Sequence, residues 1–245
     1  MNIFYREAGT MKSVNPFMER RHRMVREQIS GRGLRDPKVL DAMQRVAREA
    51  FVPEHLRDFA YADQPLPIGE GQTISQPYIV AAMTEALGLK GGENVLEIGT
   101  GSGYAAAVLA HIAREVHSVE RIAELANRAR KLLQLLGYHT VHVVEGDGSL
   151  GWPEAAPYDA IVVTAEGPRI PPSLRAQLKP GGRLVMPVSE GPFEQVLLRL
   201  TRSADDGDHV EKICPVRFVP LIGAEGWSPT ERSHAEFSPA GQPSL

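Results

Sequence analysis

The stretch Val95-Leu-Glu-Ile-Gly-Thr-Gly-Ser-Gly-Tyr104 decides the fold of this chain, because its character changes halfway along. Its first half is apolar and β-rich, whereas its second half carries glycine at Gly99, Gly101 and Gly103. An alanine-rich helical pattern follows. Glycine tolerates a positive φ and lets a ligand approach the backbone closely. The stretch therefore predicts a strand that turns sharply into a helix over a bound, nucleotide-like group.

Two classes of protein fit such a turn. The run that starts at Gly101 satisfies the dinucleotide-binding pattern G-x-G-x-x-G/A. S-Adenosyl-L-methionine (AdoMet) methyltransferases instead carry an acidic residue just before the first glycine, and Glu97 occupies that place here. A carboxylate there repels a pyrophosphate but accepts hydrogen bonds from the ammonium group of a methionine moiety. We therefore favour the methyltransferase over the dinucleotide fold, and both over a glycine turn without a ligand.

Segments with strand and helix patterns alternate along the rest of the chain. Strands are predicted at 115–119, 140–144, 158–164 and 183–188, with helices at 121–136 and 172–178. Alternation at this spacing predicts an α/β fold with a doubly wound, mostly parallel sheet and helices on both faces, the Rossmann-like arrangement. Two further strands at 195–201 and 212–221, joined by a polar turn, predict an antiparallel hairpin at the end of the sheet.

The residues before the glycine turn predict helices and one irregular loop. Helices are expected at 18–30, after the start signal Asp36-Pro37, and at 77–87. Residues 61–76 are so rich in proline and glycine that we expect no regular element there. A long loop that feeds a helix just before the nucleotide turn is a good place for functional residues.

The 245 residues suit one α/β domain with short additions. We expect a single methyltransferase domain at 18–225, in which 18–90 form a helical and loop part and 91–225 form the AdoMet-binding core. Residues 1–17 show no periodicity and are predicted to form a flexible arm. The few apolar residues of 226–245 predict a disordered tail.

Composition narrows the functional classes. A formal net charge of −3 gives no electrostatic case for binding nucleic acid, and no apolar run approaches the roughly 20 residues that span a bilayer. The single cysteine, Cys214, excludes an internal disulfide and favours a reducing compartment, so we expect a cytoplasmic protein. The histidines at 111, 117, 139 and 142 lack any tight metal-binding spacing, so no metal site is predicted.

In a doubly wound sheet, ligands bind beyond the carboxyl ends of the strands. Glu120 ends the strand after the glycine turn, where an acid can bind both ribose hydroxyls. Folds that bind NAD share this placement, so Glu120 supports a nucleoside without choosing between the two classes. Asp147 ends the next strand, where it either accepts from an adenine amino group or is a simple turn aspartate. Thr164 ends the fourth strand.

Four further motifs carry a resemblance to a known family. They are Gly69-Glu-Gly-Gln-Thr-Ile-Ser-Gln-Pro77, Pro157-Tyr-Asp-Ala-Ile-Val-Val-Thr-Ala165, Gln177-Leu-Lys-Pro-Gly-Gly-Arg-Leu-Val-Met-Pro-Val188 and Val216-Arg-Phe-Val-Pro-Leu221. In order and spacing they are similar to motifs of the protein-L-isoaspartate O-methyltransferase family, and the resemblance covers roughly residues 24–223. The first and last motifs are specific to that family, whereas the Leu-Lys-Pro-Gly-Gly run occurs in many methyltransferases.

The chain departs from the family pattern at Ala47, Gln76, Ile79 and Glu166. Glu166 matters most, because an extra carboxylate after the fourth strand would disfavour an anionic substrate at that edge. The alternative function is therefore an AdoMet-dependent methyltransferase that acts on another carboxylate or on a small molecule.

The resemblance implies a monomeric repair enzyme that needs no metal. It moves a methyl group from AdoMet to the free α-carboxylate of L-isoaspartyl residues in damaged proteins and peptides, leaving S-adenosyl-L-homocysteine. Ser75 would be the catalytic residue that orients the substrate carboxylate, with Thr164 and Val219 also beside the substrate. A simpler interpretation makes Ser75 a hydroxyl that satisfies free N–H groups at a helix start. The cofactor-binding residues implied are Thr73, Ile74, Glu97, Gly99, Thr100, Gly101, Ser102, Gly103, Glu120, Asp147 and Gly148.

Overall fold

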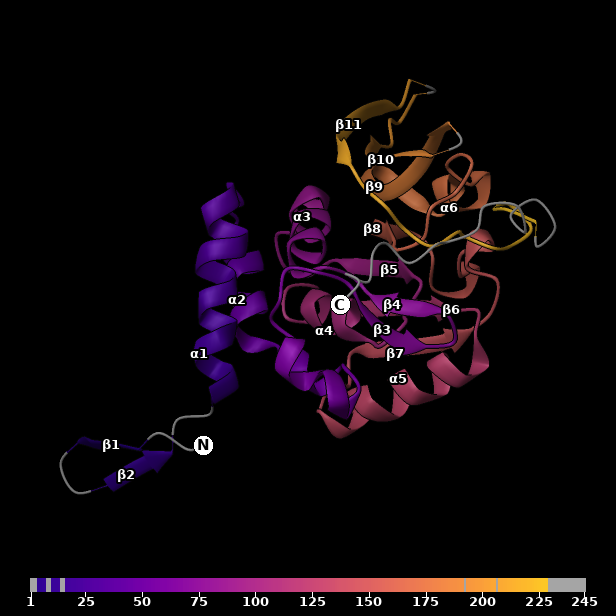
Figure 1. The fold of residues 1–245 in the computed structure, drawn as a ribbon. Helices are drawn as coiled ribbons and strands as arrows, with labels where there is room; N and C mark the ends of the chain where they lie inside the picture. The colour runs from indigo at the N-terminus through magenta and orange to yellow at the C-terminus, as the bar shows by residue number, and fades with distance from the viewer. Residues whose placement is uncertain (1–3, 8–9, 14–15, 192, 206, 229–245) are drawn as a thin grey trace.

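The computed structural model describes residues 4–7, 10–13, 16–191, 193–205 and 207–228. Among these residues, seven strands form a central sheet in the order β11-β10-β9-β8-β5-β6-β7 (Figure 1). The strands are β5 Asn94–Ile98, β6 Glu115–Glu120, β7 Val141–Glu145, β8 Tyr158–Val163, β9 Leu178–Gly191, β10 Glu194–Thr201 and β11 His209–Pro215. Strands β9, β8, β5, β6 and β7 pair in parallel, whereas β9, β10 and β11 pair antiparallel. The predicted parallel sheet with an antiparallel hairpin at its end is confirmed.

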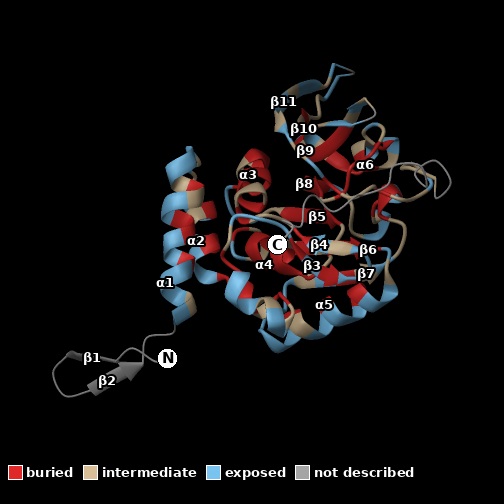
Figure 2. Ribbon diagram, viewed as in Figure 1, coloured by how far each residue is buried: buried red, intermediate tan, exposed pale blue. Residues whose placement is uncertain are grey.

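Helices cover both faces of the sheet. After two N-terminal helices, described below, the chain forms the helices α3 Pro77–Leu87, α4 Tyr104–Ala110, α5 Ala123–Leu135 and α6 Pro172–Ala176. Val95 of β5 belongs to the hydrophobic cluster that includes α3, α4 and α5, whereas its neighbour Leu96 belongs to the cluster that includes Leu174 of α6. This alternation follows from the two-residue period of a strand. Figure 2 shows both clusters as buried residues along the strands and on the sheet-facing sides of the helices.

The N-terminal helices begin and end where their sequence signals lie. The predicted helix at 18–30 is α1 Pro16–Arg23, continued by a π-helical segment, Met24–Ile29, and a 3₁₀ turn, Ser30–Arg32. It ends at Gly33, whose φ is 103°. Helix α2, Pro37–Arg45, starts as expected, because the Asp36 carboxylate accepts from the Lys38 backbone N–H at 2.8 Å. Short 3₁₀ segments complete the described helices at Arg48–Ala50, Glu54–Phe59, Gly148–Leu150 and Pro153–Ala155.

The expectation of no regular element at 61–76 is wrong. Strands β3, Leu66–Gly69, and β4, Gln72–Ile74, form an antiparallel hairpin of their own. Leu66 and Ile68 are buried while the residues between and after them are exposed, so the hairpin packs one face on the core. Proline and glycine did not prevent the strands, because the positive φ angles fall at the turn, from Gly69 to Gly71.

The last predicted strand was placed too far along the chain. It was expected at 212–221, but β11 ends at Pro215. The segment after it, yellow in Figure 1, runs back across the sheet, and Pro220 forms a parallel bridge with Glu166 beyond β8. The predicted tail also starts too early, because Trp227 donates its backbone N–H to the Leu221 carbonyl at 2.7 Å. The rest of that predicted tail, from residue 229, lies outside the described residues.

The predicted N-terminal arm is described only in part. The backbones of β1, Phe4–Glu7, and β2, Thr10–Ser13, pair antiparallel, and α1 already begins at Pro16. Residues 1–3, 8–9 and 14–15 lie outside the described residues. Elsewhere in the described part of the chain, no helix is both long and apolar enough to cross a membrane.

Candidate active site

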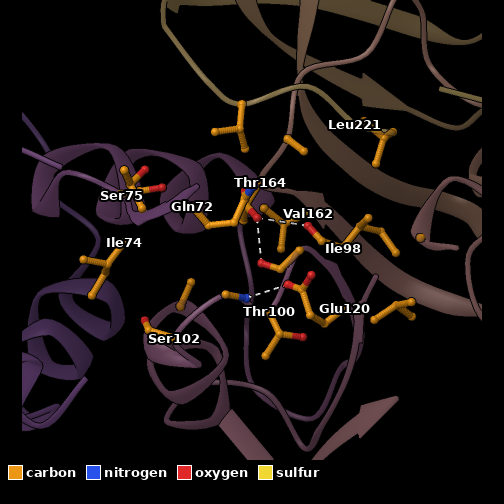
Figure 3. A pocket seen from close by; sticks show the side chains of 18 of the residues that line it. Gln72, Ile74, Ser75, Ile98, Thr100, Ser102, Glu120, Val162, Thr164 and Leu221 are labelled. Atoms are coloured by element: carbon orange, nitrogen blue, oxygen red, sulfur yellow. Dashed lines mark hydrogen bonds between the residues drawn. The ribbon is translucent and has the colours of Figure 1, made fainter. Parts of the chain in front are cut away.

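A pocket opens at the carboxyl ends of β5, β6 and β8 (Figure 3). Its walls come from β4, the helices α3 and α4, the glycine turn, the ends of β6 and β8, and the segment 219–222. The predicted site residues that line it are Thr73, Ile74, Ser75, Gly99, Thr100, Gly101, Ser102, Glu120, Gly148, Thr164 and Val219. The fold therefore brings most of the predicted site together, although its members span almost 150 positions from 73 to 219. Glu97, Gly103 and Asp147 do not line the pocket.

The glycine turn needs glycine for steric reasons. Gly99 has a φ of 93°, and a Cβ there would collide with Thr164 Oγ1. The Thr164 hydroxyl instead donates to the Gly99 carbonyl at 2.7 Å, which joins the ends of β5 and β8. Gly103 is the N-cap of α4 with a φ of 88°, and a Cβ there would press on Leu133 of α5. Gly103 thus shapes the turn from behind the pocket wall.

Glu120 is held in the pocket wall by backbone donors. Its Oε2 accepts from the Gly101 N–H and its Oε1 from the Ile122 N–H, both at 2.9 Å. Each carboxylate oxygen keeps a further lone pair for a ligand. Glu120 therefore presents two acceptor oxygens side by side, as two neighbouring ribose hydroxyls require.

Glu97 lies directly behind the glycine turn and is fully buried. Its Oε2 accepts from Ser118 Oγ at 2.5 Å, and Ser118 Oγ lies 2.6 Å from Thr100 Oγ1. Its Oε1 has no hydrogen-bond partner among the described residues. Burial raises the pKa of Glu97 to about 8; the hydrogen bond from Ser118 opposes this rise, and the charge of Glu120 adds to it. The turn is thus backed by a buried carboxyl group with a vacant acceptor.

Ser75 enters the pocket wall from the hairpin. The Arg128 guanidinium of α5 donates to the Ile68 carbonyl, which ties β3 to the core. Ser75 is half-buried and follows β4 directly. The interpretation of Ser75 as a helix cap is wrong, because the N-cap of α3 is Gln76 and no side chain among the described residues caps this helix. The Ser75 hydroxyl is therefore available to a ligand (Figure 3).

Asp147 and Gly148 were both predicted to bind the cofactor, but only Gly148 lines the pocket. Gly148 lines the pocket, where a Cβ would collide with Ile98. Asp147 does not line the pocket; its Oδ1 accepts from the Ser149 N–H at 2.9 Å and its Oδ2 accepts from the Ala224 N–H at 2.7 Å. Asp147 is thus placed as an anchor for the C-terminal segment, and the adenine contact predicted for its side chain is not supported.

Glu166, the most important departure from the family pattern, does not line the pocket. It is fully buried, and its Oε2 accepts from the indole N–H of Trp227 at 3.2 Å. A carboxylate in that position does not meet a ligand at the pocket edge. The expected repulsion of an anionic substrate therefore has no support in the geometry.

Three parts of the site were missed from the sequence: the buried Ser118, the pocket walls formed by α3 and α4, and the segment 220–222. Ser118 pairs in register with Glu97 across β5 and β6, and a hydroxyl side chain opposite the acidic residue was the available signal. The segment 220–222 lines the pocket, but its assignment to a strand concealed that role.

The site fits a nucleoside that carries an ammonium group. Glu120 offers the paired acceptors for ribose, and Glu97 offers a buried acceptor without a partner beside the glycine turn. A pyrophosphate at the same turn would face the Glu120 carboxylate, which lines the pocket, and this disfavours a dinucleotide. The fold and the site together define an AdoMet-dependent methyltransferase.

Comparison with known proteins gives the family. The model of the protein-L-isoaspartate(D-aspartate) O-methyltransferase family matches residues 19–226. The chain is 63% identical over 212 residues to protein-L-isoaspartate O-methyltransferase 1 of Rhodopseudomonas palustris (strain HaA2), covering 86% of each chain. It is 62% identical over 208 residues to protein-L-isoaspartate O-methyltransferase 2 of Pelobacter propionicus, covering 85% of this chain and 92% of the relative. The chain belongs to the protein-L-isoaspartate O-methyltransferase family.

Solved structures agree with this assignment. A protein-L-isoaspartate O-methyltransferase superposes with a TM-score of 0.76 at 30% identity, covering 85% of this chain and 67% of that chain. A second structure, of a candidate enzyme of the same kind from Plasmodium falciparum, has a TM-score of 0.70 at 25% identity. It covers 82% of this chain and 98% of its own, and it holds S-adenosyl-L-homocysteine.

Proposed function

We propose that this protein methylates the free α-carboxylate of L-isoaspartyl residues in damaged proteins and peptides, with AdoMet as the donor. The observation that carries the proposal is that Ser75 and Glu120 line one pocket. Ser75 comes from the hairpin side and Glu120 from the sheet side (Figure 3). A nucleoside held by Glu120 and a carboxylate held by Ser75 would therefore share one enclosed space.

Methyl transfer to a carboxylate needs no general acid or general base. A carboxylate has an ordinary pKa of about 4, so the attacking oxygen is already ionised at neutral pH and needs no general base. AdoMet supplies a methyl group on a positively charged sulfur, which leaves as a neutral thioether when the oxygen–carbon bond forms. The chain contributes alignment of the carboxylate with that methyl group and exclusion of the water that would solvate the anion.

On the cofactor side, each residue has a separate task in this proposal. Glu120 accepts from both ribose hydroxyls, and Gly99 and Gly101 leave room for close approach to the backbone. Glu97 acts from behind the turn, where its negative charge favours the ammonium group through the hydroxyls of Ser118 and Thr100. The wall residues next to these groups are Thr73, Ile74, Ser102 and Gly148.

On the substrate side, Ser75 donates its hydroxyl hydrogen to the α-carboxylate and so orients it. The Thr164 hydroxyl is engaged by the Gly99 carbonyl, so Thr164 shapes the space between cofactor and substrate. Val219 supplies an apolar wall that keeps water away from the reacting oxygen. The methyl ester then closes to a succinimide with loss of methanol, and hydrolysis of the succinimide returns part of the chain to normal aspartate.

The setting of the enzyme is also a proposal. We infer a cytoplasmic monomer whose partners are isoaspartyl proteins and peptides. The single cysteine favours a reducing compartment, the net charge of −3 gives no electrostatic case for binding nucleic acid, and no apolar run is long enough to span a membrane. We infer one methyltransferase domain that extends from α1 at least to Trp227, because Trp227 still donates its indole N–H to Glu166.

The product of repair tests the proposal. Wild-type enzyme and AdoMet are incubated with a synthetic isoaspartyl peptide, and chromatography follows the succinimide and the aspartyl peptide over time. We expect both products to accumulate only when AdoMet is present. Unchanged isoaspartyl peptide, together with methylation of a small carboxylic acid in the same preparation, would favour the alternative substrate class.

A further inference from the structure

The segment 219–222, here called the C-terminal wall, closes one side of the pocket although it belongs to no strand of the sheet. Glu166, which follows β8, holds the wall through two backbone hydrogen bonds. The Glu166 N–H donates to the Val219 carbonyl at 2.8 Å, and the Leu221 N–H donates to the Glu166 carbonyl at 2.7 Å. These two bonds fix the backbone of the wall at Val219 and Leu221. They do not fix the direction of the chain after Leu221.

Trp227 turns back onto this wall. Its backbone N–H donates to the Leu221 carbonyl at 2.7 Å, and its carbonyl accepts from the Gly223 N–H at 3.2 Å. Its indole N–H donates to Glu166 Oε2 at 3.2 Å. Gly226 permits the reversal, because a Cβ there would collide with the Leu221 carbonyl. Glu166 thus holds the wall with its backbone and Trp227 with its side chain.

The residues between the wall and Trp227 are anchored to two other elements. The Ala224 N–H donates to Asp147 Oδ2 at 2.7 Å, and the Glu225 N–H donates to Ser149 Oγ at 3.0 Å. The Glu225 carboxylate accepts from both the N–H and the hydroxyl of Ser173, at 2.9 and 2.8 Å, at the start of α6. Residues 224 and 225 are therefore anchored outside the wall, and Trp227 returns the chain to the wall through its bonds to Leu221 and Glu166.

We propose that Glu166 and Trp227 act as a pair of positioning residues that set the C-terminal wall against the bound isoaspartyl peptide. The pair touches neither cofactor nor substrate, since neither residue lines the pocket. It acts through Leu221 and Val219. This inference rests on the proposed function, because it takes Val219 as a wall of the peptide site. The family match ends at residue 226 and so does not include Trp227.

Loss of the pair should weaken peptide binding more than the methyl-transfer step. A wall that moves by part of an ångström still lets a bound carboxylate react, but fewer peptides bind in the correct place. We expect Trp227→Phe, which keeps the ring and removes the N–H, to raise KM for an isoaspartyl peptide about three- to tenfold and leave kcat within about twofold. Glu166→Gln retains an acceptor oxygen and should keep KM within about twofold of wild type.

Trp152→Phe is the matched control, because Trp152 and Trp227 are the two tryptophans of the chain and Trp152 does not line the pocket. It also leaves Trp227 as the sole tryptophan, whose fluorescence then reports the contact without any turnover. In that background we expect Glu166→Ala to increase acrylamide quenching at least about twofold, and Glu166→Gln to change it little. Where Glu166→Ala fails to fold, Trp227→Phe alone decides through KM.

A double-mutant cycle completes the test, because residues of one contact are not additive. Glu166→Ala with Trp227→Phe should raise KM no more than the larger single effect. Two results would overturn the pairing. One is a KM of the double variant that is raised by the product of the two single effects, and the other is an unchanged KM in Trp227→Phe. A wild-type enzyme without activity on isoaspartyl peptide would instead remove the proposed substrate, and the quenching measurement would still decide whether the contact exists.

Discussion

Glu97 of β5 and Ser118 of β6 face each other across one register pair of the parallel sheet, and the Ser118 hydroxyl donates to the Glu97 carboxyl at 2.5 Å. The pair is fully buried directly behind the glycine turn. A carboxyl group in such surroundings is costly to ionise, and the pKa of Glu97 is raised to about 8. The same group is the one that an ammonium-bearing cofactor needs in its ionised form.

The raised pKa makes Glu97 a source of pH-dependent instability in the cofactor-free protein. Its folded-state pKa of about 8 exceeds the ordinary value of 4.5, so the folded state holds the proton that the unfolded state has lost between those values. Its contribution to stability therefore falls as pH rises from about 4.5 to about 8. We expect Glu97→Gln to raise the melting temperature at pH 8 but hardly at pH 5. A lower melting temperature of this variant at pH 8 would contradict the burial argument.

Cofactor binding should release a proton from Glu97. At pH 7 the unliganded carboxyl is mostly protonated, and a bound ammonium group favours the ionised form, so affinity for AdoMet rises as pH increases from 6 toward 8. Calorimetry in buffers with different ionisation enthalpies measures the proton. Glu97→Gln isolates the titration of the AdoMet amino group and should lose the additional release. Identical proton release in wild type and Glu97→Gln would exclude Glu97 as its source.

Glu120→Ala should weaken AdoMet binding. The substitution removes hydrogen bonds between a charged group and two hydroxyls, which costs roughly 1.5–3 kcal/mol, or about ten- to a hundredfold in Kd. Glu124→Ala is a suitable control, since Glu124 is exposed in the first turn of α5. Calorimetry checks both variants. Micromolar binding of NADH without binding of AdoMet by the wild type would reverse the assignment of the pocket.

Ser75→Ala should affect turnover and not folding. The Ser75 hydroxyl caps no helix, so we expect the free energy of unfolding to change by less than about 0.5 kcal/mol. Loss of one positioned donor should lower kcat/KM about ten- to a thousandfold and leave AdoMet affinity nearly unchanged. Ser203→Ala, at the distant turn after β10, controls for the substitution itself. Normal turnover of Ser75→Ala on an isoaspartyl peptide would remove Ser75 from the mechanism.

The point at which the chain can be shortened should lie after Trp227. A chain that ends at 228 keeps the bonds of Trp227 to Leu221 and Glu166 and should melt as wild type does. A chain that ends at 226 loses these bonds and also the one that the Trp227 carbonyl accepts from the Gly223 N–H, and we expect a loss of about 1–3 kcal/mol, which lowers the melting temperature by several degrees. Equal melting of the two shortened chains would show that these bonds contribute nothing to stability.

Much of the fold was predictable because its signals are local. Gly99 and Gly103 adopt positive φ angles, and Asp36 caps the helix that follows it. In each case the residue type itself indicates the local backbone conformation. Parallel strands follow from the alternation of strand and helix patterns. The placement of Glu120 in the pocket followed in turn, because the carboxyl ends of the strands share one edge.

What the sequence did not predict depends on contacts between distant residues. The hairpin β3–β4 is stabilised by burial of Leu66 and Ile74 and by Arg128 of α5, none of which changes the loop-like composition of 61–76. The C-terminal wall makes its backbone hydrogen bonds with Glu166, more than 50 positions earlier in the chain, and not with a neighbouring strand of the predicted hairpin. The contact between Asp147 and the Ala224 N–H was also not predictable, because the two residues lie 77 positions apart.

The central claim is tested most directly by the formation of a base-labile methyl ester. Wild-type enzyme is given AdoMet labelled in the methyl group and either an isoaspartyl peptide or its aspartyl twin of the same sequence, and volatile methanol is counted after alkaline treatment. We predict label in methanol from the isoaspartyl peptide only, at least about a hundredfold above the twin. Equal labelling of both peptides, or of neither while AdoMet binds normally, would contradict the account.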